Sequence, residues 1–124
     1  MVALSATFGG AGGGGGGVSL SAVIPEGVIA SNFNDSSWTF PAVTCVASGG
    51  TPPYFYVWSY PTTSGSGSWG FAGTGTTATE APAISAVDPG QFGDATLICT
   101  VTDSAGSPAV VASNEAFYYY ENIF

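Results

Sequence analysis

The sequence predicts a single all-β domain folded as a β-sandwich. Three observations predict it: several short stretches alternate apolar and small polar residues with a period of two, clusters of Gly, Pro, Asn and Asp separate these stretches, and strong helix formers make no run. The 124 residues fit one domain around one core. About seven short strands at this spacing are expected for a sandwich.

The N-terminal segment differs from the rest because glycine dominates it. By composition alone, such a run is typical of a flexible linker. Ordering it costs on the order of 1–2 kcal/mol per residue, so an ordered run needs outside contacts. We divide the chain into a Gly-rich arm, residues 1–17, and a sandwich domain, residues 18–124. We expect the arm to pack against neighbouring copies or another protein through six consecutive glycines, Gly12, Gly13, Gly14, Gly15, Gly16 and Gly17.

Each predicted strand is bounded by a turn signal such as Pro25-Glu26-Gly27 or Val87-Asp88-Pro89-Gly90. The stretch 61–75, rich in Ser, Gly and Thr, predicts a long loop or a weak edge hairpin. Strands are predicted over residues 18–24, 38–47, 54–60, 76–84, 95–102 and, as one final strand, 108–112 with 117–120.

The stretch 95–106 is the clearest core strand of the sequence. Leu97, Cys99 and Val101 share one face, and the strand ends in an Asp-Ser-Ala-Gly turn. Cys45 precedes Trp58 by 13 residues and Cys99 by 54. We expect both residues to share the core with Cys99.

The stretch 54–60 is apolar on both faces. A sheet with one face on its own core is expected to carry polar residues on the other, but here Phe55 and Val57 occupy that position. We therefore predict that Phe55 and Val57 contact something outside the domain. The other face carries Tyr54, Tyr56, Trp58 and Tyr60.

Further aromatic residues are candidates for an interface. Trp69 and Phe71 lie in a Gly-rich stretch where core packing does not readily explain them, so they could form a sugar platform or a protein contact. The same choice applies to Tyr118, Tyr119, Tyr120 and Phe124, because a terminal strand cannot bury consecutive tyrosines on a single face.

The charge composition excludes several classes of function. The chain has no Lys, Arg or His and a formal charge of −8, so it offers no basic patch for nucleic acid or anionic lipid. No stretch approaches the roughly 20 apolar residues of a membrane span. Catalysis by a Ser or Cys nucleophile lacks a His or Lys base, and two cysteines cannot make a four-ligand zinc site.

Carboxylates remain as the one conceivable catalytic device. Asp88, Asp94 and Asp103 flank the strand 95–102, and paired acids suffice for some glycosidases. Aspartates at strand ends usually cap turns, however, and Asp103 fits that role. Loop carboxylates also suit Ca²⁺, but no EF-hand spacing is present. We therefore expect no enzymatic activity, cofactor or metal.

Two segments carry a resemblance to a known group of domains. Residues 48–59, Ser-Gly-Gly-Thr-Pro-Pro-Tyr-Phe-Tyr-Val-Trp-Ser, and residues 99–106, Cys-Thr-Val-Thr-Asp-Ser-Ala-Gly, resemble the bacterial and bacteriophage Ig-like modules of the PKD and adhesin-repeat kind. The likeness covers roughly residues 43–119 and includes the Cys, Trp, Cys spacing. It implies an Ig-like β-sandwich. Position 97 is Leu where antibody-type domains carry the corner tyrosine.

The resemblance also implies a function. Single modules of this kind resemble structural proteins of tailed-phage virions, so we expect a non-enzymatic module assembled in the host cytoplasm onto the particle surface. Its partners would be the major capsid or tail protein and copies of itself. Cys45 and Cys99 either form a disulfide worth roughly 4 kcal/mol or remain two buried thiols. The alternative function is a carbohydrate-binding or adhesive cell-surface module that uses the aromatic residues for stacking.

Overall fold

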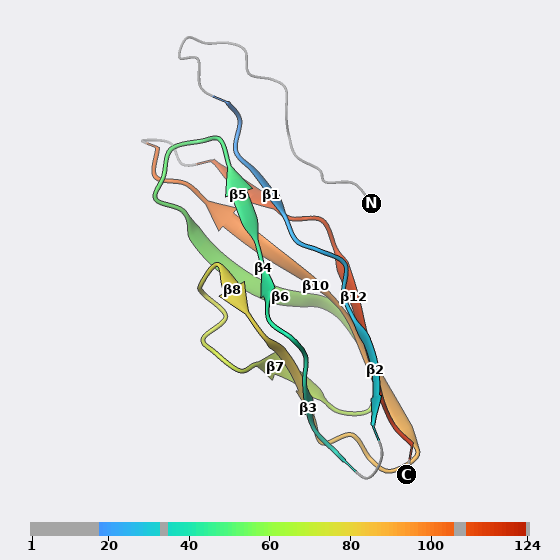
Figure 1. Ribbon diagram of the computed structural model, residues 1–124. Helices are drawn as coiled ribbons and strands as arrows, with labels where there is room; N and C mark the ends of the chain where they lie inside the picture. The colour runs from blue at the N-terminus through green and yellow to red at the C-terminus, as the bar shows by residue number, and fades with distance from the viewer. Residues whose placement is uncertain (1–17, 33–34, 106–108, 124) are drawn as a thin grey trace.

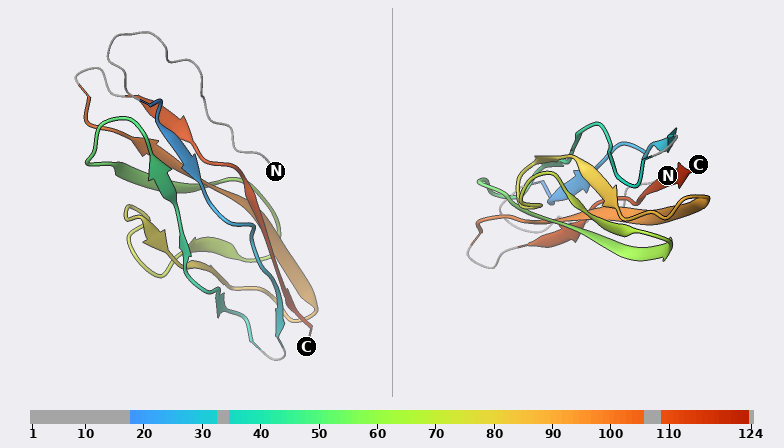
Figure 2. Two further views of the ribbon diagram at one scale, coloured as in Figure 1. Left: turned by 45° about the horizontal axis from the view of Figure 1, so that its top comes forward. Right: turned by 90° about the horizontal axis from the view of Figure 1, so that it is seen from below.

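The computed structural model describes residues 18–32, 35–105 and 109–123, and this part of the chain forms strands without a helix. The strands lie in two layers (Figures 1 and 2), so the prediction of an all-β, sandwich-like fold is confirmed. In chain order they are β1 (Ser21–Val23), β2 (Ile29–Asn32), β3 (Trp38–Thr39), β4 (Val43–Thr44), β5 (Val46–Ser48), β6 (Phe55–Gly65), β7 (Ser68–Phe71), β8 (Thr79–Glu80), β9 (Pro82–Ser85), β10 (Gln91–Thr102), β11 (Val110–Ala112) and β12 (Ala116–Asn122).

One layer is a sheet centred on β10, which we call the large sheet. β6 pairs with β10 along one edge, and β11 and β12 pair with successive parts of the other edge, all antiparallel. β2 adds to the far side of β12 in parallel orientation. The ladder between β10 and β6 shifts register between Thr96 and Ile98.

The other layer, which we call the split layer, consists of three short ladders. They are β1 with β5, β4 with β8, and β3 with β9 and β7. Backbone hydrogen bonds from Phe40 N to Pro82 O and from Cys45 N to Ala78 O, both 2.8 Å, continue the pairing between these ladders. The single strand predicted over residues 38–47 is therefore interrupted into β3, β4 and β5, one break lying at Pro41, which has no N–H to donate.

The core lies between the two layers. In β10, Leu97, Cys99 and Val101 are fully buried, as the period-two pattern predicts. Their neighbours Ile98 and Thr100 point to the opposite side and are half-buried. The largest fully buried side chains include Tyr118, Tyr120, Phe40, Ile24, Ile84 and Leu97.

The stretch 61–75 forms neither the long loop nor the edge hairpin that the sequence predicted, because its two strands pair with different partners. β6 continues to Gly65, and after a short turn β7 pairs with β9 rather than with β6. The turn has Gly65 at φ 84° and Gly67 at φ 95°, a left-handed backbone region that favours glycine. The chain thus passes from the large sheet to the split layer within three residues.

The chain also changes layers between β1 and β2. β1 pairs with β5 in the split layer, whereas β2 joins β12 in the large sheet. The side chain of Asn114 holds this crossing: its Oδ1 accepts from Ile24 N at 2.7 Å, and its Nδ2 donates to Ile24 O at 2.8 Å. An amide side chain therefore replaces a strand neighbour for Ile24.

Asp103 caps the turn at the end of β10, as predicted from its position in the sequence. Its carboxylate accepts hydrogen bonds from the backbone N–H groups of Thr51 at 2.9 Å, Ala109 at 2.9 Å and Ala105 at 3.2 Å. These bonds, that of Ala109 foremost, hold the pKa of Asp103 below its usual value. The carboxylate thus joins the loop before β6 to the start of β11.

Candidate functional site

The outward side of the large sheet carries an unusual set of exposed side chains. Phe55 and Val57 of β6 point away from the core and are 58% and 56% exposed. The prediction that these residues meet a partner stays a prediction. Other large apolar side chains share this side, and we call the set the apolar face: Ile29, Phe55, Val57, Phe92, Val110 and Phe117.

Strand register places these side chains in rows across the sheet. Phe55 is the register partner of Thr102, and Thr102 that of Val110 on the next strand. Side chains opposite each other in a ladder lie on the same face, about 4.5–5.5 Å apart at Cβ. The row therefore presents one apolar side chain on each side of Thr102.

The other end of the apolar face combines aromatic rings with carboxylates. The rings of Phe92 and Tyr119 stack with centroids 5.5 Å apart and planes 17° apart. The Tyr119 hydroxyl donates to Glu121 Oε1 at 3.2 Å, and Ser64 Oγ donates to Asp94 Oδ1 at 2.6 Å. Burial, then the hydrogen bond to Glu121 and the negative charges of Glu121 and Asp94, raise the pKa of Tyr119. The potential at this end of the face is therefore negative.

A small pocket of about 220 Å³ lies beside the apolar face at its β2 and β12 edge, and we call it the notch. One of its lining residues is Gly27, where a Cβ would collide with the backbone carbonyl of Phe117. The segment before β2 can therefore approach β12 closely. Exposed Glu26 and Glu115 supply its carboxylates, and Ile29, 71% exposed, adds an apolar wall. The lining residues are Glu26, Gly27, Ile29, Glu115, Ala116 and Phe117.

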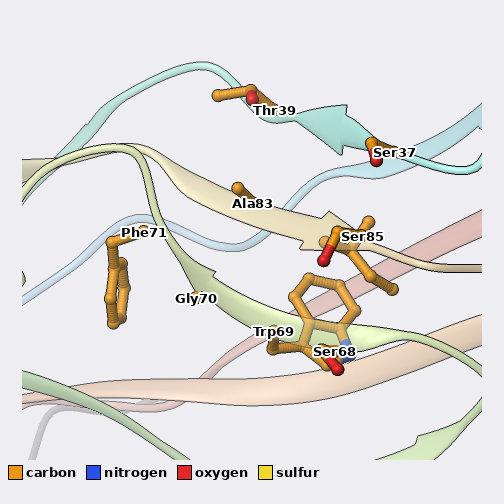
Figure 3. Close-up of a pocket in the computed structure, with 9 residues that line it drawn as sticks. Ser37, Thr39, Ser68, Trp69, Gly70, Phe71, Ala83 and Ser85 are labelled. Atoms are coloured by element: carbon orange, nitrogen blue, oxygen red, sulfur yellow. The ribbon is translucent and has the colours of Figure 1, made fainter.

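The outward side of the split layer is different, and we call it the hydroxyl face. Hydroxyl groups pair across its ladders, Ser21 with Ser48 at 3.1 Å and Thr44 with Thr79 at 2.8 Å. Farther along, β3, β9 and β7 border a hollow of about 340 Å³ (Figure 3). Small residues line most of it, namely Ser37, Thr39, Ser68, Gly70, Ala83 and Ser85, together with Ile84, Trp69 and Phe71.

One buried carboxylate organises the split layer from inside. Glu80 is 4% exposed, and its Oε2 accepts from the hydroxyl of Thr77 at 2.7 Å and from the N–H of Thr77 at 3.1 Å. Burial raises the pKa of Glu80, but these bonds and others from the backbone of Gly75 and Thr76 outweigh it and leave the pKa lowered. Like Asp103, Glu80 is structural.

The predicted core group is brought together. Cys45, Trp58 and Cys99 are all buried, and Trp58 is the register partner of Cys99. The two cysteines are thiols in this structure and hydrogen-bond to each other. That bond, followed by burial, raises the pKa of the Cys99 thiol. The indole N–H of Trp58 donates to Thr77 O at 2.7 Å.

Trp69 and Phe71 pack inward, so the expectation that core packing does not account for them was wrong. The Trp69 ring stacks on Phe40 with centroids 5.8 Å apart, and the Phe71 ring stacks on Tyr60 at 4.9 Å. Figure 3 shows the Phe71 ring pointing away from Ala83. Pairing of β7 with β9 imposes this direction, because alternate residues of a strand face opposite sides.

Tyr118 and Tyr120 were predicted at an interface, and this was wrong: both side chains are fully buried. β12 pairs with β10 so that Tyr118 faces the core beside Ala95, while Phe117 and Tyr119 point outward. The Tyr120 hydroxyl donates to Asp35 O at 3.1 Å.

Two predicted contact regions, the glycines at 12–17 and Phe124, lie outside the described residues. The residues that the sequence reasoning missed are Ile29, Phe92, Val110 and Phe117. The sequence does contain a signal for them, since each is an apolar residue at a strand position where the alternation predicts an outward side chain. The notch depends on contacts between distant segments and has no local signal.

Comparisons with protein-family models, with curated proteins and with solved structures find no match for this chain. Within residues 18–32, 35–105 and 109–123, no helix is long and apolar enough to cross a membrane. In the same described residues, no cluster of three or more His, Cys, Asp or Glu side chains could hold a metal ion.

Proposed function

We propose that this protein is a non-enzymatic structural module of a bacteriophage particle, which decorates or cements the capsid or tail through protein contacts. The observation that supports it most is the apolar face. Phe55, Val57 and Val110 are each more than half exposed on one side of one sheet. Exposed apolar patches of this kind mark interaction sites in soluble proteins.

The phage setting rests on the likeness of residues 48–59 and 99–106 to phage and bacterial Ig-like modules. A structural module needs contact area and no reactive group, and the chain offers neither a basic side chain nor a His. Trp69 and Phe71 are half-buried and stack on Phe40 and Tyr60, so core packing accounts for these rings and we do not propose the carbohydrate-binding alternative.

The test is whether the chain is part of a particle. Particles would be purified from a culture in which the genome that encodes the chain replicates, and their proteins would be quantified by mass spectrometry. We expect the chain at a fixed ratio to the major capsid or tail protein. Its absence from intact particles, with the protein present in the lysate, would contradict the proposal.

A further inference from the structure

We propose that the apolar face docks a basic protein surface, and that the notch receives a Lys or Arg side chain of that partner. This inference deepens the proposed function and rests on it, since the partner would be another protein of the particle. It identifies the surface that makes the contact and the chemistry that the contact recognises.

The size of the face is that of a specific interface. The large sheet is four strands wide over part of its length, and β10 contains 12 residues. The five strands of the sheet contain 37 residues in all, so with strands about 4.8 Å apart and a rise of about 3.3 Å per residue this side covers roughly 590 Å². A standard interface buries about 800 Å² on each partner. One face of this sheet therefore comes close to an interface on its own.

The charges on and beside the face are all negative. Asp94 and Glu121 lie on its outward side, and Glu26 and Glu115 border the notch. The chain has no Lys, Arg or His to neutralise them. A partner that covers the face brings these carboxylates into a drier environment, where each needs an opposite charge or a hydrogen-bond donor. Cationic side chains from the partner supply both.

The same charges disfavour a second copy as the occupant. Each copy has a formal charge of −8 and carries no cation, so a self-complementary contact would bring carboxylates only toward other carboxylates or neutral groups. Nucleic acid and anionic lipid are repelled for the same reason. Charge complementarity therefore selects a basic protein.

The notch matches the two-part nature of a Lys or Arg side chain. Ile29 and Phe117 form apolar walls along which the methylene stem can lie, and Glu26 and Glu115 supply negative charge for its head. Its volume of about 220 Å³ accommodates one such side chain. Gly27 allows the segment before β2 to approach Phe117 closely.

Carbodiimide cross-linking of intact particles tests the lysine arm of the proposal. The reagent joins a carboxylate directly to an amine, and the chain contains no Lys. Any product with a lysine must therefore come from a different protein. We expect Glu26 or Glu115 to be linked to a lysine of a capsid or tail protein. Products confined to Asp35 and Asp88, which do not line the notch, would overturn the lysine arm.

A competition experiment covers both the lysine and the arginine arm. Particles lacking the chain would be mixed with isotope-labelled wild type and one unlabelled variant, and the bound ratio measured. We expect Glu115→Gln to lower occupancy about fivefold and the double change with Glu26→Gln about tenfold or more. Asp88→Asn, which also removes one exposed charge, serves as the matched control and should change nothing.

The outcomes separate the two proposals. Reduced occupancy with a lysine cross-link identifies Lys in the notch, and reduced occupancy without one identifies Arg. Equal occupancy of Glu115→Gln, Asp88→Asn and wild type would overturn this inference while leaving the proposed function intact. So would a stable dimer in sedimentation whose formation requires Phe55 and Val57. Absence of the wild-type chain from particles would instead contradict the proposed function itself.

Discussion

The two outward faces of the sandwich differ in side-chain size, polarity and charge. On the hydroxyl face, Thr44 and Thr79 pair through their side chains, as expected for a sheet that faces water. The exposed apolar side chains of that face include one valine pair, Val23 and Val46. On the apolar face, equivalent outward positions hold Phe55 and Val57, each more than half exposed. Packing of the core does not require this difference, since both layers bury their inward side chains. The difference therefore indicates that a function of the apolar face, and not the stability of the core, accounts for its exposed apolar side chains.

The apolar face also has a cost that is smaller on the hydroxyl face, where Val23 and Val46 are exposed but aromatic rings are not. Exposed apolar patches favour unwanted association, and a net charge of −8 on every copy opposes it. Uniformly negative charge thus keeps copies apart and leaves the face open to a cationic partner. Four sets of variants test this comparison, in order of decreasing expected effect.

The largest effect contrasts two adjacent residues of β12. Tyr118→Ala removes a fully buried ring from the core and should lower the free energy of unfolding by about 3–5 kcal/mol. Phe117→Ala, one position away on the apolar face, should change it by about 1 kcal/mol or less, because Phe117 is 48% exposed. Urea unfolding of the purified variants measures both. Similar losses for the two would contradict the inward and outward assignment.

The second effect compares paired variants on the two faces. Phe55→Ser with Val57→Thr should lower particle occupancy about 30-fold or more, since burying each side chain at a contact contributes about 1.5–3 kcal/mol. The matched control is Val23→Thr with Val46→Thr on the hydroxyl face, where the two valines are 42% and 61% exposed. Competition on particles lacking the chain measures both pairs. An equal loss in the control pair would mean that the hydroxyl face binds as well.

The sequence predicted the interior better than the surface. In β10 the outward residues are mostly polar, so the alternation identifies Leu97, Cys99 and Val101 as core without knowledge of the fold. In residues 117–120 both phases are aromatic, so hydrophobicity does not decide which one is buried. Only the register with β10, which places Tyr118 opposite Ala95, decides it.

The other residues of the candidate site could not be placed from the sequence, because long-range contacts decide which way their side chains point. Trp69 and Phe71 lie between glycines and serines, and only the pairing of β7 with β9 turns their rings inward. The notch arises where Gly27 approaches Phe117, a contact between segments at opposite ends of the chain. Local sequence patterns do not encode such contacts. The absence of Lys, Arg and His, by contrast, follows directly from the composition.

The third effect concerns the carboxylate that fixes one end of the apolar face. Asp103 joins the loop before β6 to the start of β11, so it helps to position Phe55 and Val110. Its pKa is lowered in the folded state, so its contribution to stability is present above the unfolded value of about 3.9 and is lost as the pH falls through the folded value.

The urea midpoint of the wild type should decline as the pH falls from about 5 to about 3, and Asp103→Asn should make this decline less steep. The control is Asp88→Asn, which removes one carboxylate from the exposed turn before β10 and leaves the hydrogen bonds of Asp103 in place. The midpoint measured across this range checks the difference. An unchanged slope in Asp103→Asn would contradict the structural role assigned to this carboxylate.

The smallest effect makes the hydroxyl face resemble the apolar face. Thr44→Val with Thr79→Val replaces an exposed hydroxyl pair by side chains of the same shape, so the free energy of unfolding should change by about 0.5 kcal/mol or less. Apolar surface on the hydroxyl face would then extend beyond Val23 and Val46, but the notch would still flank only the apolar face. If charge and shape select the partner, this variant gains no occupancy on particles already saturated with wild type. A second bound copy per site would show that apolar surface alone suffices, and the contrast between the two faces would then reduce to hydrophobicity.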